Sequence, residues 1–284
     1  MNDQTILIVG ANGQLGQALR AKYTGARTSD SDTLDITSIS QLEKYDWSGI
    51  QTIINAAAFT DVDRAESPEG RISSWKVNAE GAANLASIAI GHDLTLLHIS
   101  SDYVFDGTNE LHTEEEEFSP LGVYGQSKAA GDIAVALVPK HYILRTSWVI
   151  GEGKNFVRTM LDLGKRNIAP TVVNDQVGRL TFTSELVAII DHLLATSAAY
   201  GTYNATNTGE TVSWADITRA IFQIAGFNLV TTGISTVDYF KGKSGIAPRP
   251  LNSVMDLSKL QASGYTGHDW HEDLRAYVQK ELAK

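Results

Sequence analysis

The sequence contains no cysteine. This absence excludes disulfides, cysteine–zinc sites and a thiol nucleophile. Long apolar runs are also missing: the stretch from Leu186 to Leu194 is interrupted by Asp191 and His192, so we expect no membrane span. A strand pattern at Ile6–Val9 begins almost at once, without a signal-type segment before it, and we therefore expect the cytoplasm.

Basic residues are outnumbered by acidic ones, 23 against 33, which gives a formal net charge of −10. Nucleic-acid binders usually carry a basic patch or stripe, so this balance argues against that class of partner. A small anionic ligand is not excluded, because a few arginines and helix N-termini can hold phosphate. The acidic run Glu114–Glu117 is interpreted as a solvated loop.

The 284 residues, 43% of them hydrophobic and 20% charged, have the composition of a folded α/β protein with a substantial core. The first half alternates β-branched runs with helical patterns, which predicts a doubly wound parallel sheet. The expected strands are Ile6–Val9, Ala26–Ser29, Thr52–Asn55, Leu94–Ser100 and Tyr142–Arg145. The expected helices are Leu15–Lys22, Ile39–Lys44, Trp75–Gly91 and Tyr124–Leu137.

The pattern loosens after about residue 150. A strand at Thr171–Asn174 and helices at Phe156–Gly164, Glu185–Thr196 and Ser213–Gly226 are separated by loops rich in Gly and Pro. We expect a dinucleotide-binding domain over residues 1–150. Residues 151–284 are expected to form mainly a smaller substrate-binding lobe, with segments that return to the first domain.

A glycine-rich turn, Gly10-Ala-Asn-Gly13-Gln-Leu-Gly16, follows the first strand and opens the first helix. Glycines at this place allow a tight turn and let the backbone approach a pyrophosphate, whose charge lies at the helix N-terminus. The spacing G-x-x-G-x-x-G differs from G-x-G-x-x-G, so a ligand-free turn is the alternative. The expected cofactor contacts from this turn are Gly10, Asn12, Gly13, Gln14 and Leu15.

Asp30 lies twenty residues after Gly10, at the end of the second strand. A carboxylate there binds the adenine-ribose hydroxyls and repels a 2′-phosphate, which favours NADH over NADPH. Arg27 weakens that preference, and Asp32 or Asp35 could take the ribose role, so both cofactors stay open. The small side chains after the third strand leave room for a cofactor, although packing also explains them. The remaining expected cofactor contacts are Ile36, Ala56, Ala57, Ala58, Asn78 and Ser100.

Tyr124 and Lys128 are four residues apart in a predicted helix, so their side chains share one face. An ammonium beside a phenol favours the phenolate and lowers the tyrosine pKa toward the working range. The pattern alone is weak, because such a pair arises by chance in many helices.

The serine in Ile99-Ser-Ser101-Asp-Tyr-Val-Phe-Asp-Gly107, about twenty residues before Tyr124, makes the set specific. Together these residues resemble the extended short-chain dehydrogenase/reductase superfamily, and within it the family of dTDP-4-dehydrorhamnose reductases. The similar stretches are Gly10–Gly16, 55–66, 77–79, 100–107, 123–132, 145–148, 154–157, 174–178 and 249–253. Two positions depart from the family: Ser101 replaces a usual threonine, and Lys154 replaces a usual asparagine.

The resemblance implies hydride transfer from NADH or NADPH to the C4 ketone of a dTDP-linked 6-deoxy sugar. It implies that Tyr124 protonates the sugar oxygen and that Lys128 holds the nicotinamide ribose. Ser101 would donate a hydrogen bond to the carbonyl oxygen. Asn78 is interpreted as a polar relay behind Lys128, or as a capping residue. The expected substrate contacts, each with a structural role as its alternative, are Ser101, Asp102, Trp148, Asn155, Gln176, Gly178, Thr181 and Arg249.

Some members of the family bind a metal through acidic residues at a dimer contact. The sequence does not locate those ligands, so magnesium stays uncertain and either a monomer or a homodimer is compatible with the chain. His268 and His271 form a His-x-x-His pattern without carboxylate neighbours at ligand spacing, so we predict no metal there. Three alternatives remain: a reductase of another nucleotide sugar, an epimerase, and a non-catalytic regulatory subunit of the same fold.

Overall fold

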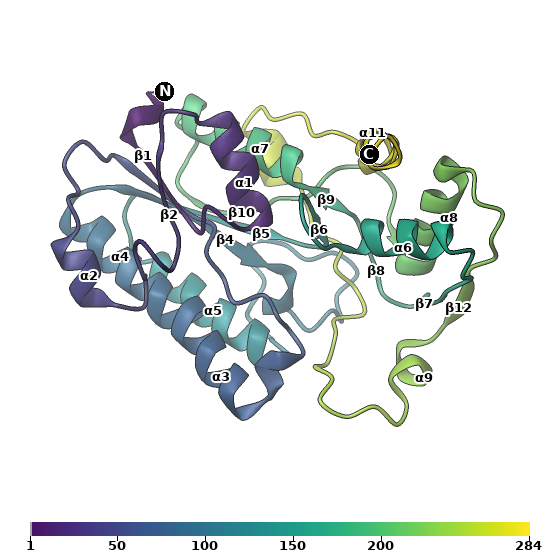
Figure 1. Ribbon diagram of the computed structural model, residues 1–284. Helices are drawn as coiled ribbons and strands as arrows, with labels where there is room; N and C mark the ends of the chain where they lie inside the picture. Colours follow the sequence, from purple (N-terminus) through teal and green to yellow (C-terminus); the bar gives the residue numbers. More distant parts are fainter. Residues whose placement is uncertain (1) are drawn as a thin grey trace.

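The protein, a computed structural model that describes residues 2–284, is built around a six-stranded parallel sheet (Figure 1). Its strand order is β2–β1–β3–β4–β5–β10, so the chain reverses direction across the sheet between β1 and β3. A reversal of this kind opens a crevice at the carboxyl ends of the two strands, where ligands bind in such sheets. The strands are β1 (Ile6–Val9), β2 (Arg27–Ser29), β3 (Thr52–Asn55), β4 (Thr95–Ser101), β5 (His141–Thr146) and β10 (Gly201–Asn204).

Both faces of the sheet are covered, which is why its strands are apolar along their whole length. In β1, Ile6 and Ile8 pack with α1 (Gln14–Lys22) and α7 (Thr183–Thr196) on one face. Leu7 and Val9 of the same strand pack with the helices of the opposite face. Figure 1 shows α1 and α7 above the sheet and α2, α3, α4 and α5 below it. The helices of the lower face are α2 (Ile39–Lys44), α3 (Pro68–Trp75), α4 (Ala82–Gly91) and α5 (Val123–Val135).

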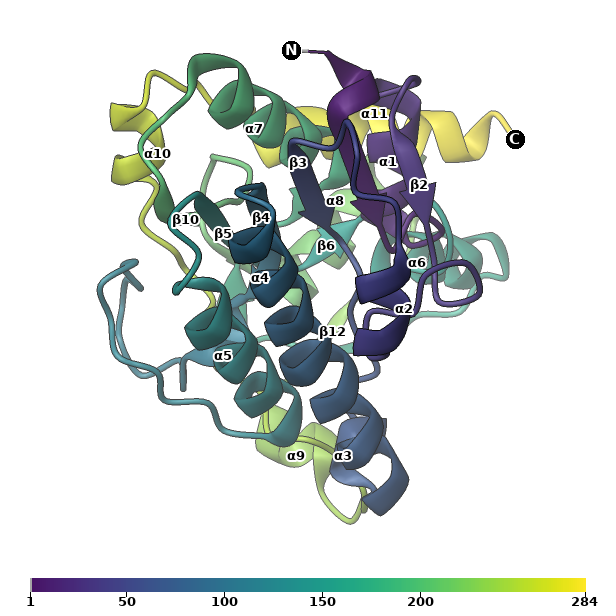
Figure 2. The ribbon, with the colours of Figure 1, turned by 90° about the vertical axis from the view of Figure 1, so that its left-hand side faces the viewer.

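The helix expected at Trp75–Gly91 begins earlier than predicted. It runs from α3 through a π-helical segment (Lys76–Gly81) into α4. Ser67 starts it by accepting a hydrogen bond from the Gly70 N–H, and Pro68 occupies the first turn. This Ser-Pro start signal is visible in the sequence, but the apolar periodicity only becomes clear a turn later. Figure 2 shows the resulting helical run beside α5.

A second hydrophobic core lies beyond the carboxyl ends of the large sheet. It joins α6 (Phe156–Lys165), α8 (Trp214–Ala225) and α11 (Trp270–Leu282). The sequence pattern did not predict α11. Three two-stranded sheets flank this core: β6 (Val149–Ile150) with β9 (Thr181–Phe182), β7 (Thr171–Val173) with β12 (Thr232–Ile234), and β8 (Val177–Gly178) with β11 (Val212–Ser213). The short helices α9 (Thr236–Phe240) and α10 (Ser258–Ala262) complete this half.

Part of the second half of the chain packs on the large sheet. Leu186 and Ile190 of α7, Tyr203 of β10 and Leu260 of α10 belong to the core beneath α1. The expected division at residue 150 therefore separates the two cores only in part, because these segments cross back. Within residues 2–284, no helix combines the length and the apolar character that crossing a membrane requires.

Candidate active site

The glycine-rich turn after β1 is shaped by the protein's own backbone. Gly10 has a φ of +77°, and a Cβ there would lie 2.5 Å from the Ala57 nitrogen. A Cβ on Gly16 would lie 2.2 Å from the Gly10 carbonyl oxygen, so neither position accepts a side chain. Gly13 has no such neighbour and is the N-cap of α1, without a side-chain hydrogen bond to the helix. The first N–H groups of α1 therefore stay available for an anion.

A cavity of about 340 Å³ opens beside this turn, at the crevice between β1 and β3. Nine of the predicted cofactor residues line it: Gly10, Asn12, Gly13, Asp30, Asp35, Ile36, Ala56, Ala57 and Ala58. Six further lining residues were missed by the sequence reasoning: Val9, Ser31, Leu34, Thr37, Phe59 and Val77. A free helix N-terminus, an acidic residue at the end of β2 and a largely apolar wall together fit a dinucleotide.

The acidic end of the cavity is organised around Asp30. Its carboxylate accepts hydrogen bonds from the Thr33 backbone and side chain, and from the side-chain amide of Asn12 in the glycine turn. Arg27 turns away and donates to the Asp46 and Ser48 carbonyl oxygens, at 2.9 Å each. Asp30 therefore faces the cavity without a cation from Arg27, the arrangement that suits ribose hydroxyls.

Four predicted cofactor residues outside the catalytic pair do not line this cavity. Gln14 donates to the Lys154 carbonyl oxygen at 3.3 Å, and Leu15 is buried in the core beneath α1. Ser100 is buried inside the sheet. Asn78 accepts from the Phe59 N–H at 2.8 Å, and its Nδ2 donates to the Phe59 carbonyl oxygen at 3.1 Å.

Asn78 is not a relay behind Lys128, and this interpretation needs correction. Besides its bonds to Phe59, its amide donates to the Ser127 hydroxyl at 3.0 Å, and it has no hydrogen bond to Lys128. The π-helical segment directs the side chain toward the loop after β3. Asn78 thus fixes Phe59, which is itself part of the cavity wall.

The three predicted catalytic residues come from the end of β4 and the first turns of α5. Ser101 ends β4, donates to Asp102 Oδ1 at 3.1 Å and accepts from the Tyr103 N–H at 3.2 Å. Burial raises the pKa of Tyr124 to about 12, and a hydrogen bond with Ser101 opposes this rise. The Tyr103 ring packs edge-on against Tyr124, with ring centroids 5.5 Å apart.

Lys128 is buried and its Nζ donates to the Ile99 carbonyl oxygen at 2.6 Å. Burial lowers its pKa to about 8, while Asp132 opposes that change. The expected lowering of the Tyr124 pKa by Lys128 is absent from this ligand-free site, where burial of the phenol dominates. Tyr124 therefore keeps its proton at neutral pH, which is the state required of a proton donor.

Several predicted substrate residues converge next to this trio. Asp102 accepts from the Ser253 hydroxyl at 2.6 Å, and Ser253 lies against Gly178. A Cβ on Gly178 would meet the Trp148 ring at 3.1 Å. Trp148 has a φ of +49° and stacks on Trp214 with centroids 3.9 Å apart. The segment around Ser253 thus connects the catalytic strand end with an aromatic wall.

Other predicted substrate residues have structural partners instead. Asn155 caps α6 by accepting from the Arg158 N–H at 3.0 Å, and Thr181 is fully buried in β9. Gln176 donates to the Thr236 hydroxyl at 3.0 Å. Arg249 pairs with Asp63 at 2.7 Å, so its guanidinium bridges the two halves of the chain.

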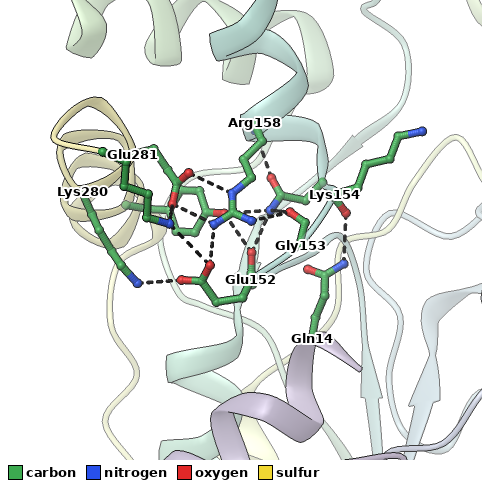
Figure 3. A network of polar contacts seen from close by, with 11 residues as sticks. Gln14, Glu152, Gly153, Lys154, Arg158, Lys280 and Glu281 are labelled. Atoms are coloured by element: carbon green, nitrogen blue, oxygen red, sulfur yellow. Dashed lines mark hydrogen bonds and ion pairs between the residues drawn. The ribbon is translucent and has the colours of Figure 1, made fainter. Parts of the chain in front are cut away.

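A polar network that the sequence did not reveal fixes the loop between β6 and α6 (Figure 3). Arg158 donates to both carboxylate oxygens of Glu281 in α11, at 2.9 Å each, and pairs with Glu152. Lys280 also pairs with Glu152, at 2.7 Å. The Lys154 carbonyl of the same loop accepts the hydrogen bond from Gln14, so the loop joins α11 to the start of α1.

One group of potential metal ligands is found within residues 2–284: Glu185, His268 and Asp273, whose ligand atoms lie within 4.8 Å of one another. The buried Glu185 accepts from the His268 N–H, and its Oε2 lies 3.4 Å from His268 Nδ1. His271 is not part of this group, because it pairs with Asp269 and Glu210. The sequence did not predict the approach of Glu185 to His268, since 83 positions separate them.

The fold and the site together define a dinucleotide-binding α/β protein with a serine, a tyrosine and a lysine at the carboxyl end of its sheet. The model of the RmlD substrate binding domain family matches residues 4–283, and the chain belongs to that family. A dTDP-4-dehydrorhamnose reductase from Aggregatibacter actinomycetemcomitans is 39% identical over 96% of this chain and 99% of its own.

Solved structures agree with this membership. A dTDP-4-dehydrorhamnose reductase from Clostridium acetobutylicum is 36% identical and superposes with a TM-score of 0.90, over 98% of this chain and 99% of its own. The enzyme of the same name from Bacillus anthracis, solved in complex with NADP, is 35% identical with a TM-score of 0.88. That match covers 97% of this chain and 98% of the other.

Proposed function

We propose that the protein reduces the C4 ketone of dTDP-4-dehydro-β-L-rhamnose to dTDP-L-rhamnose, with NADPH or NADH as the reductant. One observation carries the proposal. Ser101 and Tyr124, joined by a hydrogen bond, lie with Lys128 at the same sheet edge as the dinucleotide cavity. The nearly full-length relatives named dTDP-4-dehydrorhamnose reductase support the substrate. We place the reaction in the cytoplasm and leave monomer and homodimer as alternatives for the assembly.

The cofactor supplies the hydride when bound, and the protein positions the ketone and provides the proton. Tyr124, whose pKa is raised by burial, is protonated at neutral pH and gives its proton to the oxygen that becomes the 4-hydroxyl. Ser101 turns its hydroxyl from Asp102 to the carbonyl oxygen as negative charge develops there. Lys128 restores the proton of Tyr124, a task suited to an ammonium with a pKa of about 8.

The substrate is proposed to lie between this trio and the second core. Trp148 forms the wall beside the sugar, and Asp102 with Ser253 fixes the floor. Arg249 is the candidate for the diphosphate because its fork of N–H donors can bind two phosphate oxygens at once. Its bond to Asp63 then breaks or is shared when the substrate binds.

The test is oxidation of NADPH and of NADH by the purified protein with dTDP-4-dehydro-β-L-rhamnose. We expect turnover with at least one cofactor, and a loss of about 10²–10⁴-fold in kcat for Tyr124→Phe with cofactor affinity kept. Tyr200→Phe, a change at a half-exposed surface tyrosine, is the matched control and should retain activity. Absence of turnover with both cofactors refutes the function. Full activity of Tyr124→Phe refutes the assigned proton donor.

A further inference from the structure

His98 of β4 lies behind Lys128 and is fully enclosed. Its Nε2 is 3.3 Å from the Lys128 Nζ, and its side chain is 1% exposed. On its other side, His98 Nδ1 is 3.0 Å from the side-chain nitrogen of Asn55 in the neighbouring strand. A buried imidazole between an amide and an ammonium must distribute its protons so that donors meet acceptors.

Asn55 decides which nitrogen of His98 carries the proton. Its Oδ1 accepts the Ala57 N–H at 3.1 Å, so its Nδ2 has only N–H groups to offer. His98 Nδ1 must then accept, and the proton of the neutral ring resides on Nε2. A second proton on Nδ1 would face the Asn55 N–H, beside the Lys128 cation, and is therefore excluded. Burial and the Lys128 charge also hold the pKa of His98 well below its usual range.

The Nε2–H of His98 faces two groups. One is Lys128 Nζ, which can accept this proton's hydrogen bond only as a neutral amine. The other is Asp132 Oδ1, 4.0 Å away, which has no hydrogen-bond partner within residues 2–284. Asp132 is held from its other oxygen by Arg145 Nε at 3.3 Å. The unpartnered oxygen is thus aimed at the ring without being bonded to it.

Resting on the proposed function, we propose that His98 is a positioning residue that makes Lys128 a better proton donor. When Lys128 gives a proton to the Tyr124 phenolate, its neutral amine accepts the His98 Nε2–H. When Lys128 regains a proton from solvent, the Nε2–H turns to Asp132 Oδ1. His98 itself stays neutral throughout, so one proton leaves Lys128 and one returns in each turnover. Asp132 favours the charged lysine and His98 the neutral one.

The groups that act on this switch are few. Tyr124 and Asp132 come from α5, Arg145 from β5 and Asp102 from the turn after β4. The Ser100 hydroxyl faces Asp132 and is uncharged. Because His98 and Asp132 act on Lys128 in opposite directions, their removal must move its titration in opposite directions. A merely structural role for either residue does not predict that sign.

The experiment measures the pH profile of kcat/KM for four variants. His98→Leu should move the basic limb up by about one pH unit, since the neutral amine loses a hydrogen-bond donor. His98→Gln, which keeps an N–H donor, should restore the wild-type limb, and Asp132→Asn should move it down. The control is His192→Gln, whose ring bonds to Ser263 far along the chain, and its profile should stay unchanged.

A second measurement needs no turnover. Imidazole ¹⁵N spectra of the wild-type protein, with His98 assigned from the His98→Gln variant, should show a neutral ring protonated at Nε2 across the neutral pH range. A proton on Nδ1, or a charged ring, overturns the proposal even if a variant fails to fold. A basic limb that His98→Leu leaves in place, or moves down, also overturns it. If the wild-type protein oxidises neither cofactor, the proposed function fails while the spectra still decide the tautomer.

Discussion

Asp102 shows how a single buried carboxyl serves the site at an energetic cost. It holds the Ser101 and Ser253 hydroxyls, at 3.1 and 2.6 Å, yet burial raises its pKa to about 6. In the unfolded chain its pKa is near 3.9, so between these values the folded state binds the extra proton. Ionising Asp102 therefore removes stability as the pH rises from about 4 to 6.

Asp102→Asn should remove this dependence on pH. Relative to the wild type, the variant should gain about 3 kcal/mol in the free energy of unfolding between pH 4 and pH 6.5, because a two-unit pKa shift corresponds to that amount. Urea unfolding of both proteins across this range measures the difference. Asp32→Asn, at an exposed aspartate, is the control and should run parallel to the wild type. A difference between Asp102→Asn and wild type that does not vary with pH would contradict the assigned burial.

At the scale of elements, strands and helices with strong local signals were predictable. β1 and β3 match their predicted bounds, and α2 does as well. Continuous apolar runs fix strands buried on both faces, and period 3.6 fixes the helices. The two-residue strands β6, β8, β9 and β11 were not predicted, because such short segments carry no periodicity and form only through their partners. The helix α11 was missed for a related reason: its first turn is strongly polar, with His271, Glu272 and Asp273.

Asn155 connects an element boundary to a predicted binding role. Its side chain caps α6 through the Arg158 N–H and also donates to the Tyr277 hydroxyl, at 2.8 Å, in α11. Asn155→Ala should lower the free energy of unfolding by about 2 kcal/mol, one part from the cap and one from the lost donor bonds. Asn155→Ser, which keeps a capping oxygen, should lose about half as much. Equal stability of all three proteins in chemical denaturation would rule out the capping role.

At the scale of the whole molecule, Arg249 and Asp63 join the two halves of the chain across 186 positions. Because the proposed diphosphate site uses this arginine, Arg249→Ala should raise KM for the nucleotide sugar by about 10–100-fold while kcat changes little. Lost hydrogen bonds to a charged group account for that size. Arg249→Lys should show a smaller rise, since a point charge replaces the fork. Arg166→Ala, at an exposed arginine of α6, is the control in the same steady-state assay. An unchanged KM in Arg249→Ala would remove the residue from the substrate site.

The sequence by itself determined the large sheet, the glycine turn and the trio Ser101, Tyr124 and Lys128. These features depend on neighbours in the chain: a turn geometry that only Gly10 and Gly16 permit, and a helical spacing that places Tyr124 and Lys128 on one face. Local physics of this kind is written in residue order.

Only the tertiary structure decided what surrounds that trio. It replaced Asn78 by His98 as the neighbour of Lys128 and turned Asn155 to the cap of α6. It also buried Tyr124 so that its pKa rises rather than falls. Burial and cross-strand partners arise from strands and loops far apart in sequence, so no local pattern encodes them. The dielectric environment and the protonation of the catalytic residues are therefore properties of the packed molecule.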